Sequence, residues 1–123
     1  GFFEGIDYLL PVPLFSSRLR QRGYNQSELL ARGISRVTGI PLCTDAVVRS
    51  RNNATQTHKS GYARWQNVDR LFLSTPHAAN LHDKHILLVD DVLTTGATLV
   101  ACADALLGVE NIKISVLTLA WAR

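Results

Sequence analysis

HILLVDDVLTTGATL, spanning His85–Leu99, contains the most regular pattern in this chain. Its aliphatic run predicts a strand over His85–Val92 that is buried on both faces, as strands of parallel sheets are. Apolar residues with helical spacing follow and predict a helix over Thr95–Leu107 that Gly108 ends. Two acids therefore stand at the carboxyl end of a buried strand, and a short loop leads from them into a helix.

Upstream of this pattern, the polar residue Asn25 with Glu28 three positions later predicts the start of another helix. Gly39 and Pro41 end it. Its buried stripe is expected to consist of four aliphatic residues: Leu29, Leu30, Ile34 and Val37.

The remaining elements are strands and polar connections. The apolar run Ile6–Val12 predicts a strand that ends near Leu10 or lies at a sheet edge, because its prolines cannot donate to a ladder. Three further apolar segments are expected to be strands: Pro41–Val48, Arg70–Leu73 and Ile112–Leu119. Two polar segments are expected to be a functional loop and a connector, respectively: Arg49–Trp65 and Thr75–Lys84. This order predicts a single α/β domain with three layers, in which a mostly parallel sheet has helices on both faces.

The composition excludes several classes of protein. The chain has 123 residues, 46% of them hydrophobic, and contains no apolar run long enough to span a membrane. Cys43 and Cys102 are expected to be buried free thiols in a cytoplasmic protein. Ten arginines and lysines but only three acids lie between Arg18 and Arg70, whereas the rest of the chain is acidic. This asymmetry fits an anionic ligand bound with a divalent ion, although charge alone favours an ordinary solvated surface.

The segment from Asp90 to Thr98 offers two kinds of chemistry. Carboxylates accept hydrogen bonds from sugar hydroxyls or bind Mg²⁺ through its waters. Gly96 allows close backbone approach, and threonine hydroxyls and a helix amino end suit a phosphate. Together these groups suit a ribose 5-phosphate. The alternative is a helix capped by Thr94 or Thr95 beside two solvated acids. The residues required for a P-loop or a dinucleotide fingerprint are absent.

LLVDDVLTTGATL closely resembles the 5-phosphoribosyl 1-pyrophosphate (PRPP) loop of type I phosphoribosyltransferases. The wider chain resembles the ComF family, also called the GntX-like or competence-protein family of amidophosphoribosyltransferase-like proteins. LPVPL at 10–14, RLRQRGYNQSELLA at 18–31 and ATQTHKSGYARWQNV at 54–68 contribute to this resemblance, which covers nearly the whole chain. The fold it implies is the type I phosphoribosyltransferase fold with its Rossmann-like core. The family's amino-terminal zinc ribbon is expected to be missing from this domain.

The resemblance also implies residue roles. Asp90 and Asp91 would bind the ribose hydroxyls and Mg²⁺, the latter through water. A phosphate loop would consist of Thr94, Thr95, Gly96, Ala97 and Thr98. The pyrophosphate group would be bound by three arginines: Arg18, Arg20 and Arg22. A flexible loop would contribute Gln56, Lys59 and Arg64, and the catalytic set would be Asp90, Asp91, Lys59 and Arg64.

Three functions follow from the resemblance. The first is transfer of phosphoribosyl from PRPP to a nitrogen acceptor with release of pyrophosphate. The second is a non-catalytic, PRPP-binding accessory protein of DNA uptake that contacts single-stranded DNA or a helicase partner. The third is a PRPP-sensing regulator. The sequence leaves open the acceptor, the general base and whether the protein is a homodimer.

Overall fold

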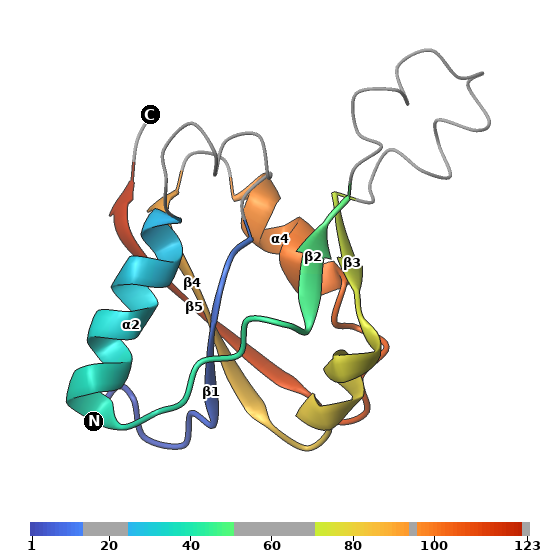
Figure 1. Cartoon of the computed structure of the whole chain (residues 1–123), viewed down its shortest axis with the longest axis horizontal. Helices are drawn as coiled ribbons and strands as arrows, with labels where there is room; N and C mark the ends of the chain where they lie inside the picture. Colours follow the sequence, from blue (N-terminus) through green and yellow to red (C-terminus); the bar gives the residue numbers. More distant parts are fainter. Residues whose placement is uncertain (14–24, 51–70, 94–95, 122–123) are drawn as a thin grey trace, which may run out of the picture.

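The computed structural model describes residues 1–13, 25–50, 71–93 and 96–121. Figure 1 shows their arrangement. The elements in chain order are β1 (Tyr8–Pro11), α2 (Gln26–Thr38), β2 (Val47–Arg49), β3 (Phe72–Ser74), the 3-10 helix η2 (Pro76–Leu81), β4 (His85–Leu93), α4 (Ala97–Asp104) and β5 (Lys113–Trp121).

A three-stranded parallel sheet forms the centre of the described structure. Its order is β1-β4-β5, and β4 pairs with both neighbours in the parallel sense. Leu87 of β4 is in register with Leu9 of β1 and with Ser115 of β5. The predicted parallel α/β fold is therefore confirmed, and the acidic pair belongs to the central strand.

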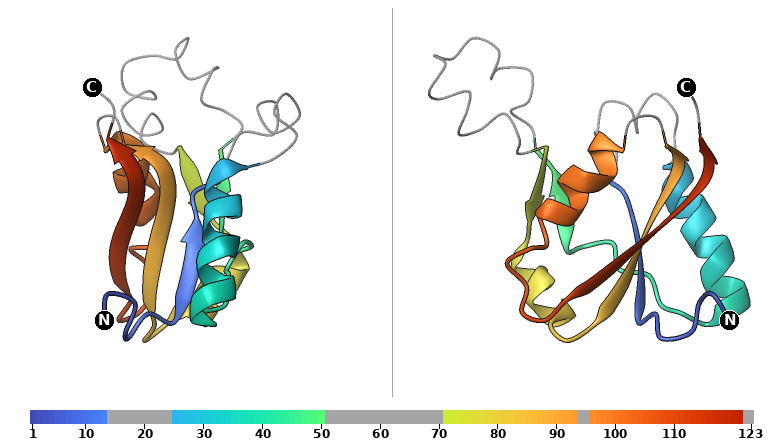
Figure 2. Two further views of the ribbon diagram at one scale, coloured as in Figure 1. Left: turned by 90° about the vertical axis from the view of Figure 1, so that its left-hand side faces the viewer. Right: turned by 180° about the vertical axis from the view of Figure 1, so that it is seen from behind.

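The two faces of the sheet are covered by different elements (Figure 2). On one face, α2 packs through Ala31 against Leu9 and Leu87. On the other face, α4 packs together with β2, β3 and η2 in the larger core cluster. The four aliphatic residues Ile86–Val89 are all completely buried, as expected for a strand with a layer on each side.

β1 lies at the edge of the sheet, which explains how it accommodates proline. Val12 donates its backbone N–H to the carbonyl of Val89 in β4, whereas Leu9 donates in the opposite direction, to the carbonyl of Pro41. Hydrogen-bonding directions alternate along a strand, so the position of Pro11, which lacks an N–H, faces away from β4. The prediction of an edge strand is confirmed, and the strand continues to Pro11 rather than ending near Leu10.

The expected strand over Pro41–Val48 forms only at its carboxyl end, as β2. Only Leu42 forms an isolated parallel bridge, to Leu9. β2 begins at Val47 and pairs antiparallel with β3 in a separate two-stranded sheet. The buried residues Val47 and Phe72 pack into the α4-side core, so this pair covers one face of the parallel sheet instead of extending it.

Helix α2 begins and ends where predicted, and two of its four predicted stripe residues, Leu30 and Ile34, are partly buried against the core while the other two are not. Asn25 is the N-cap, and Gly39 ends the helix in the left-handed conformation with φ of 80°. Val37 is 87% exposed and Leu29 is 54% exposed, so neither belongs to the core. The residues of α2 that are buried are Ser27 and Ala31, one turn apart on the face toward the sheet.

One other segment also departs from expectation. The expected connector Thr75–Lys84 contains η2, whose residues Ala78 and Leu81 are buried in the core. Thr75 accepts a hydrogen bond from the backbone N–H of His77, and Pro76 occupies the first turn.

The structure describes Cys43 and Cys102 as buried free thiols, as predicted. None of its described helices is long and apolar enough to cross a membrane.

Candidate functional site

The amino ends of both long helices lie at the same end of the molecule as the carboxyl ends of the parallel strands (Figures 1 and 2). In open α/β sheets, ligands bind at this end, where strand termini and helix amino ends surround a crevice. The acidic pair lies here, because Asp90 follows the buried Val89 in β4 and is in register with Thr118 of β5. We therefore build the candidate site outward from Asp90.

One oxygen of the Asp90 carboxylate accepts hydrogen bonds from two different elements. The hydroxyl Oγ of Ser27 donates to Asp90 Oδ1 at 3.0 Å, and the backbone N–H of Asp91 donates to the same oxygen at 3.0 Å. Burial raises the pKa of Asp90 above its usual value, and the Ser27 hydroxyl acts in the opposite direction because it stabilises the ionised form. Asp90 is thus a half-buried acid whose orientation is set by the first turn of α2.

Asp90 also acts on helix α4. Burial is the main reason that the pKa of the Cys102 thiol is raised to about 12, and the negative charge of Asp90 adds to this effect. The Cys102 thiol is fully buried and remains protonated at neutral pH, so we assign it no chemical role. The electrostatic effect indicates that the Asp90 carboxylate is close to α4 as well as hydrogen-bonded to α2.

The first turn of α2 is fixed to the end of β1. Asn25 Oδ1 accepts hydrogen bonds from the backbone N–H groups of Ser27 at 2.9 Å and Glu28 at 3.4 Å. The same side chain donates from Nδ2 to the carbonyl of Val12 at 3.1 Å. One asparagine therefore caps the helix and joins the two ends of the basic segment 14–24.

Substitution of Asn25 should separate these two roles. Asn25→Ser keeps a capping oxygen but is too short to reach Val12, so we expect a loss of about 1 kcal/mol in the free energy of unfolding. Asn25→Ala removes both interactions, and we expect a loss of about 2 kcal/mol. Urea unfolding of the two variants provides the test.

The matched control is Asn80→Ala, since Asn80 is exposed in η2. Its free energy of unfolding should change by less than about 0.5 kcal/mol. Equal stabilities of Asn25→Ser and Asn25→Ala would contradict a separate contribution from the link to Val12.

Helix α4 begins two residues later than predicted. Its N-cap is Gly96, with φ of 82°, a left-handed conformation that favours glycine. Gly96 has no side chain with which to cap the first turn, so neither Thr94 nor Thr95 is the N-cap. Ala97 is exposed and Thr98 is half-buried in that first turn. The structure therefore brings a helix amino end without a capping side chain to the same end of the sheet as Asp90.

Most of the other predicted site residues lie outside the described part of the chain: Arg18, Arg20, Arg22, Gln56, Lys59, Arg64, Thr94 and Thr95. The described residues that flank their segments are nevertheless informative. Ser50 donates its backbone N–H to the carbonyl of Leu71 at 2.7 Å, so the two ends of segment 51–70 are adjacent. β2 ends and β3 begins at the strand-end side of the sheet, as do the flanks of segment 14–24 (Figure 1).

The sequence did not indicate that two further residues, Ser27 and Arg49, lie near the site. Ser27 appeared only as a residue in the first turn of a helix. Arg49 was assigned to the polar loop, but it ends β2, and its Cζ lies 5.1 Å from the ring centroid of the buried Phe72. Its positive charge also acts on the Cys102 thiol, lowering that group's pKa slightly against the larger effect of burial. The β-branched pair before Arg49 was the available signal for a strand ending there.

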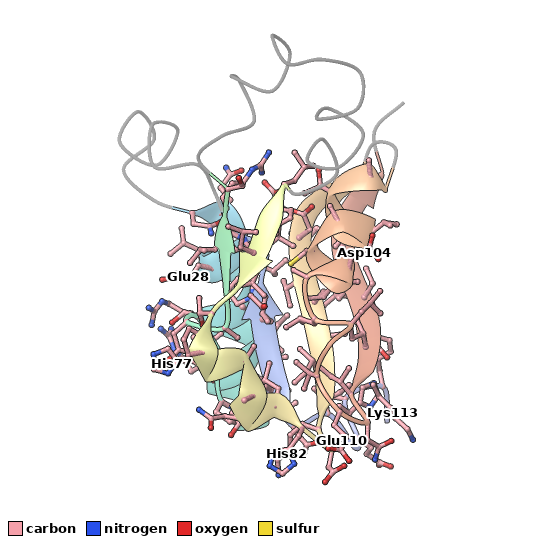
Figure 3. All side chains as sticks on the ribbon, turned by 90° about the vertical axis from the view of Figure 1, so that its right-hand side faces the viewer. Glu28, His77, His82, Asp104, Glu110 and Lys113 are labelled. Atoms are coloured by element: carbon pink, nitrogen blue, oxygen red, sulfur yellow. The ribbon has the colours of Figure 1, made fainter. Side chains whose placement is uncertain are left out.

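The described histidines do not contribute to this site. His82 lies at the end of the molecule opposite the strand carboxyl ends, and His77 lies at one side of the molecule (Figure 3). Each is exposed beside an acid: His77 Nδ1 is 3.8 Å from Asp45, and His82 Nδ1 is 3.3 Å from Asp83. Among the residues that the structure describes, no three His, Cys, Asp or Glu side chains are grouped as metal ligands. Two adjacent carboxylates fit Mg²⁺, which keeps several waters and is completed by substrate phosphates.

Comparison with known proteins identifies the class to which this fold and site belong. Residues 24–122 match the model of a family described as the phosphoribosyl transferase domain. The chain therefore belongs to the phosphoribosyl transferase domain family, and its relatives place it in the ComF-like group of type I members, as predicted.

The relatives are longer proteins. The chain is 38% identical over 108 residues to Competence protein F of Haemophilus influenzae, covering 86% of this chain and 47% of that protein. It is 38% identical over 102 residues to DNA utilization protein YhgH of Escherichia coli, covering 82% and 43% respectively. It is 35% identical over 99 residues to Competence protein ComFC of Bacillus subtilis, covering 80% and 38%. The chain thus spans less than half the length of these curated relatives.

Proposed function

We propose that this domain binds PRPP together with Mg²⁺ and transfers the phosphoribosyl group to a nitrogen acceptor, releasing pyrophosphate. The observation that carries the proposal is the placement of Asp90. This half-buried carboxylate is hydrogen-bonded to α2, stands at the carboxyl end of the central strand, and lies at the same end of the sheet as the amino end of α4. Two acidic residues and a helix amino end of the kind that suits a phosphate therefore occur at one end of one sheet.

The two parts of the site would bind opposite ends of the sugar. Asp90 and Asp91 would accept hydrogen bonds from the ribose hydroxyls. The amino end of α4 would bind the 5-phosphate through its N–H groups and dipole, helped by the hydroxyls of its threonines. The proposed phosphate loop consists of Thr94, Thr95, Gly96, Ala97 and Thr98.

The pyrophosphate end of the ligand would be bound by segments that begin and end at this side of the sheet. Guanidinium groups match phosphate oxygens in geometry as well as charge. We assign this role to Arg18, Arg20 and Arg22. Gln56, Lys59 and Arg64 would cover the reacting atoms and exclude water that competes with the acceptor.

The chemistry would be a displacement at the anomeric carbon. The bond from that carbon to the pyrophosphate oxygen breaks, and pyrophosphate leaves with the electron pair. The nitrogen of the acceptor forms the new bond and loses its proton to solvent. The transition state is oxocarbenium-like, so the negative charges of Asp90 and Asp91 would stabilise the developing positive charge. Bound Mg²⁺ would neutralise the departing pyrophosphate.

The test is a pair of measurements on the same protein. Titration calorimetry with PRPP and Mg²⁺ should give saturable binding, and pyrophosphate should be released when ammonia, amines or nucleobases are added. Glucose 6-phosphate, a phosphorylated sugar without the pyrophosphate, is the matched control ligand. Absence of PRPP binding would refute the proposal.

A second function is favoured by the relatives, which are named competence and DNA utilization proteins. In that case the domain would bind PRPP without turnover. It would contact single-stranded DNA or a helicase through its basic segment, which has ten arginines and lysines but only three acidic residues between Arg18 and Arg70. Binding that neutralises phosphates weakens steeply with salt. Saturable PRPP binding without pyrophosphate release, combined with salt-sensitive binding of single-stranded DNA, would favour this second function over the first.

A further inference from the structure

The hydroxyl of Ser27 occupies an unusual place for a helix residue. It is 4% exposed, lies on the sheet-facing side of α2, and donates to Asp90 across a sequence separation of 63 residues. Its backbone N–H is bound at 2.9 Å by the side chain of Asn25, which is itself bound to Val12. The position from which this hydroxyl donates is therefore set by the helix cap and by β1.

Two hydrogen bonds to Asp90 use the same oxygen. Ser27 Oγ and the backbone N–H of Asp91 each donate to Oδ1. The side chain of Asp91 also forms a hydrogen bond with the Asp90 carboxyl group and raises the pKa of Asp90. A carboxylate with two donors on one oxygen cannot rotate without breaking at least one hydrogen bond, so its second oxygen has a defined direction.

We propose that Ser27 is a positioning residue for sugar recognition: by holding Oδ1 of Asp90, it sets the direction in which this carboxyl group meets the hydroxyls of the ribose. This inference rests on the proposed function, because it assumes that Asp90 binds the ribose. It differs from a purely structural role for Ser27. A structural role would affect every ligand of the domain equally, whereas a positioning role affects only ligands with ribose hydroxyls.

The test compares ligands with and without the sugar in the variant Ser27→Ala. Phosphorus NMR titrations would measure the affinity of wild type and variant for PRPP, ribose 5-phosphate and inorganic phosphate, with Mg²⁺ present. We expect Ser27→Ala to bind PRPP and ribose 5-phosphate about 10- to 100-fold more weakly, the range for losing a hydrogen bond to a charged group. Its affinity for inorganic phosphate should change by less than about twofold, since the α4 end of the site does not involve Ser27.

The matched control is Ser35→Ala, the same substitution two turns further along α2, at a half-buried position. It should leave all three affinities unchanged. Ser27→Thr, which keeps the hydroxyl, should retain most of the affinity for ribose 5-phosphate. Thermal unfolding of each variant would confirm that the fold is preserved.

The possible outcomes distinguish the positioning role of Ser27 from the proposed PRPP-binding function on which it rests. If wild type binds PRPP but Ser27→Ala binds every ligand normally, or loses sugar and phosphate equally, the positioning role is refuted and the proposed function stands. If wild type binds neither PRPP nor ribose 5-phosphate, the proposed function is refuted and the positioning role with it. A selective loss for the two sugar ligands would support both.

Discussion

A variant carrying both Asp90→Asn and Asp91→Asn is expected to bind PRPP at least about a thousandfold more weakly than wild type, from the loss of two charged acceptors. Asparagine is nearly the same size as aspartate, but it is neutral and has one acceptor oxygen instead of two. The ribose hydroxyls would lose their strongest partners, and Mg²⁺ would lose both carboxylates. Calorimetry with PRPP and Mg²⁺ gives the affinity.

The same variant should remain folded. Burial raises the pKa of Asp90, so this acid favours folding most when it is protonated, and its contribution falls as the pH rises above the pKa of the unfolded chain. At neutral pH the folded protein therefore holds an ion that burial disfavours, and an uncharged side chain removes that cost. Thermal unfolding at neutral pH should give a midpoint equal to that of wild type or higher.

Asp104→Asn is the matched control, because Asp104 is exposed at the carboxyl end of α4, the end opposite the proposed phosphate site. It removes one charge by the same chemical change and should leave PRPP affinity within about twofold of wild type. Unchanged affinity in the double variant would mean that PRPP binds elsewhere or through other groups.

Leu87→Ala is expected to lower the free energy of unfolding by about 3 kcal/mol, a large part of the stability of a domain this size. Leu87 is completely buried in the central strand and packs with Leu9, Ala31 and Val89 beneath α2. Truncation removes apolar contacts and leaves a cavity between the helix and the sheet. Urea unfolding followed by circular dichroism measures the change.

Leu119→Ala tests the specificity of this effect. Leu119 is in β5 and is 70% exposed, so the same truncation should cost less than about 0.5 kcal/mol. A loss of comparable size in the two variants would contradict the burial that places α2, and with it Ser27, against the sheet.

Strong local patterns accounted for the correct sequence predictions. The aliphatic run before Asp90 predicted β4, the helical spacing of the apolar residues after the loop predicted α4, and the capping pattern at Asn25 predicted α2. Each depends on residues within a few positions of one another, so the relevant physics is visible in a short window. The start of α4 was misplaced because the sequence does not determine the φ angle of Gly96. The structure shows that this glycine is left-handed and precedes the helix as its N-cap.

The incorrect predictions concern packing partners. Val37 is exposed although it lies on the apolar face of its helix. Helical periodicity identifies such a face but does not determine how much of it the sheet covers. The strand predicted over Pro41–Val48 is shorter than expected, and apolar composition did not indicate that it would pair with β3 in a separate sheet. η2 was missed although Thr75 and Pro76 form a recognisable helix start, since the core that buries Ala78 and Leu81 comes from distant parts of the chain.

The sequence by itself determined the order of β1, α2, β4, α4 and β5, the acidic pair at the end of a buried strand, and the family to which the chain belongs. These follow from local preferences and from a motif of contiguous residues. Only the tertiary structure revealed that Ser27 donates to Asp90 and that Asn25 links α2 to β1. The reason is physical: a parallel sheet brings the ends of non-consecutive strands together through long crossover connections, and no short stretch of sequence records which side chains then meet.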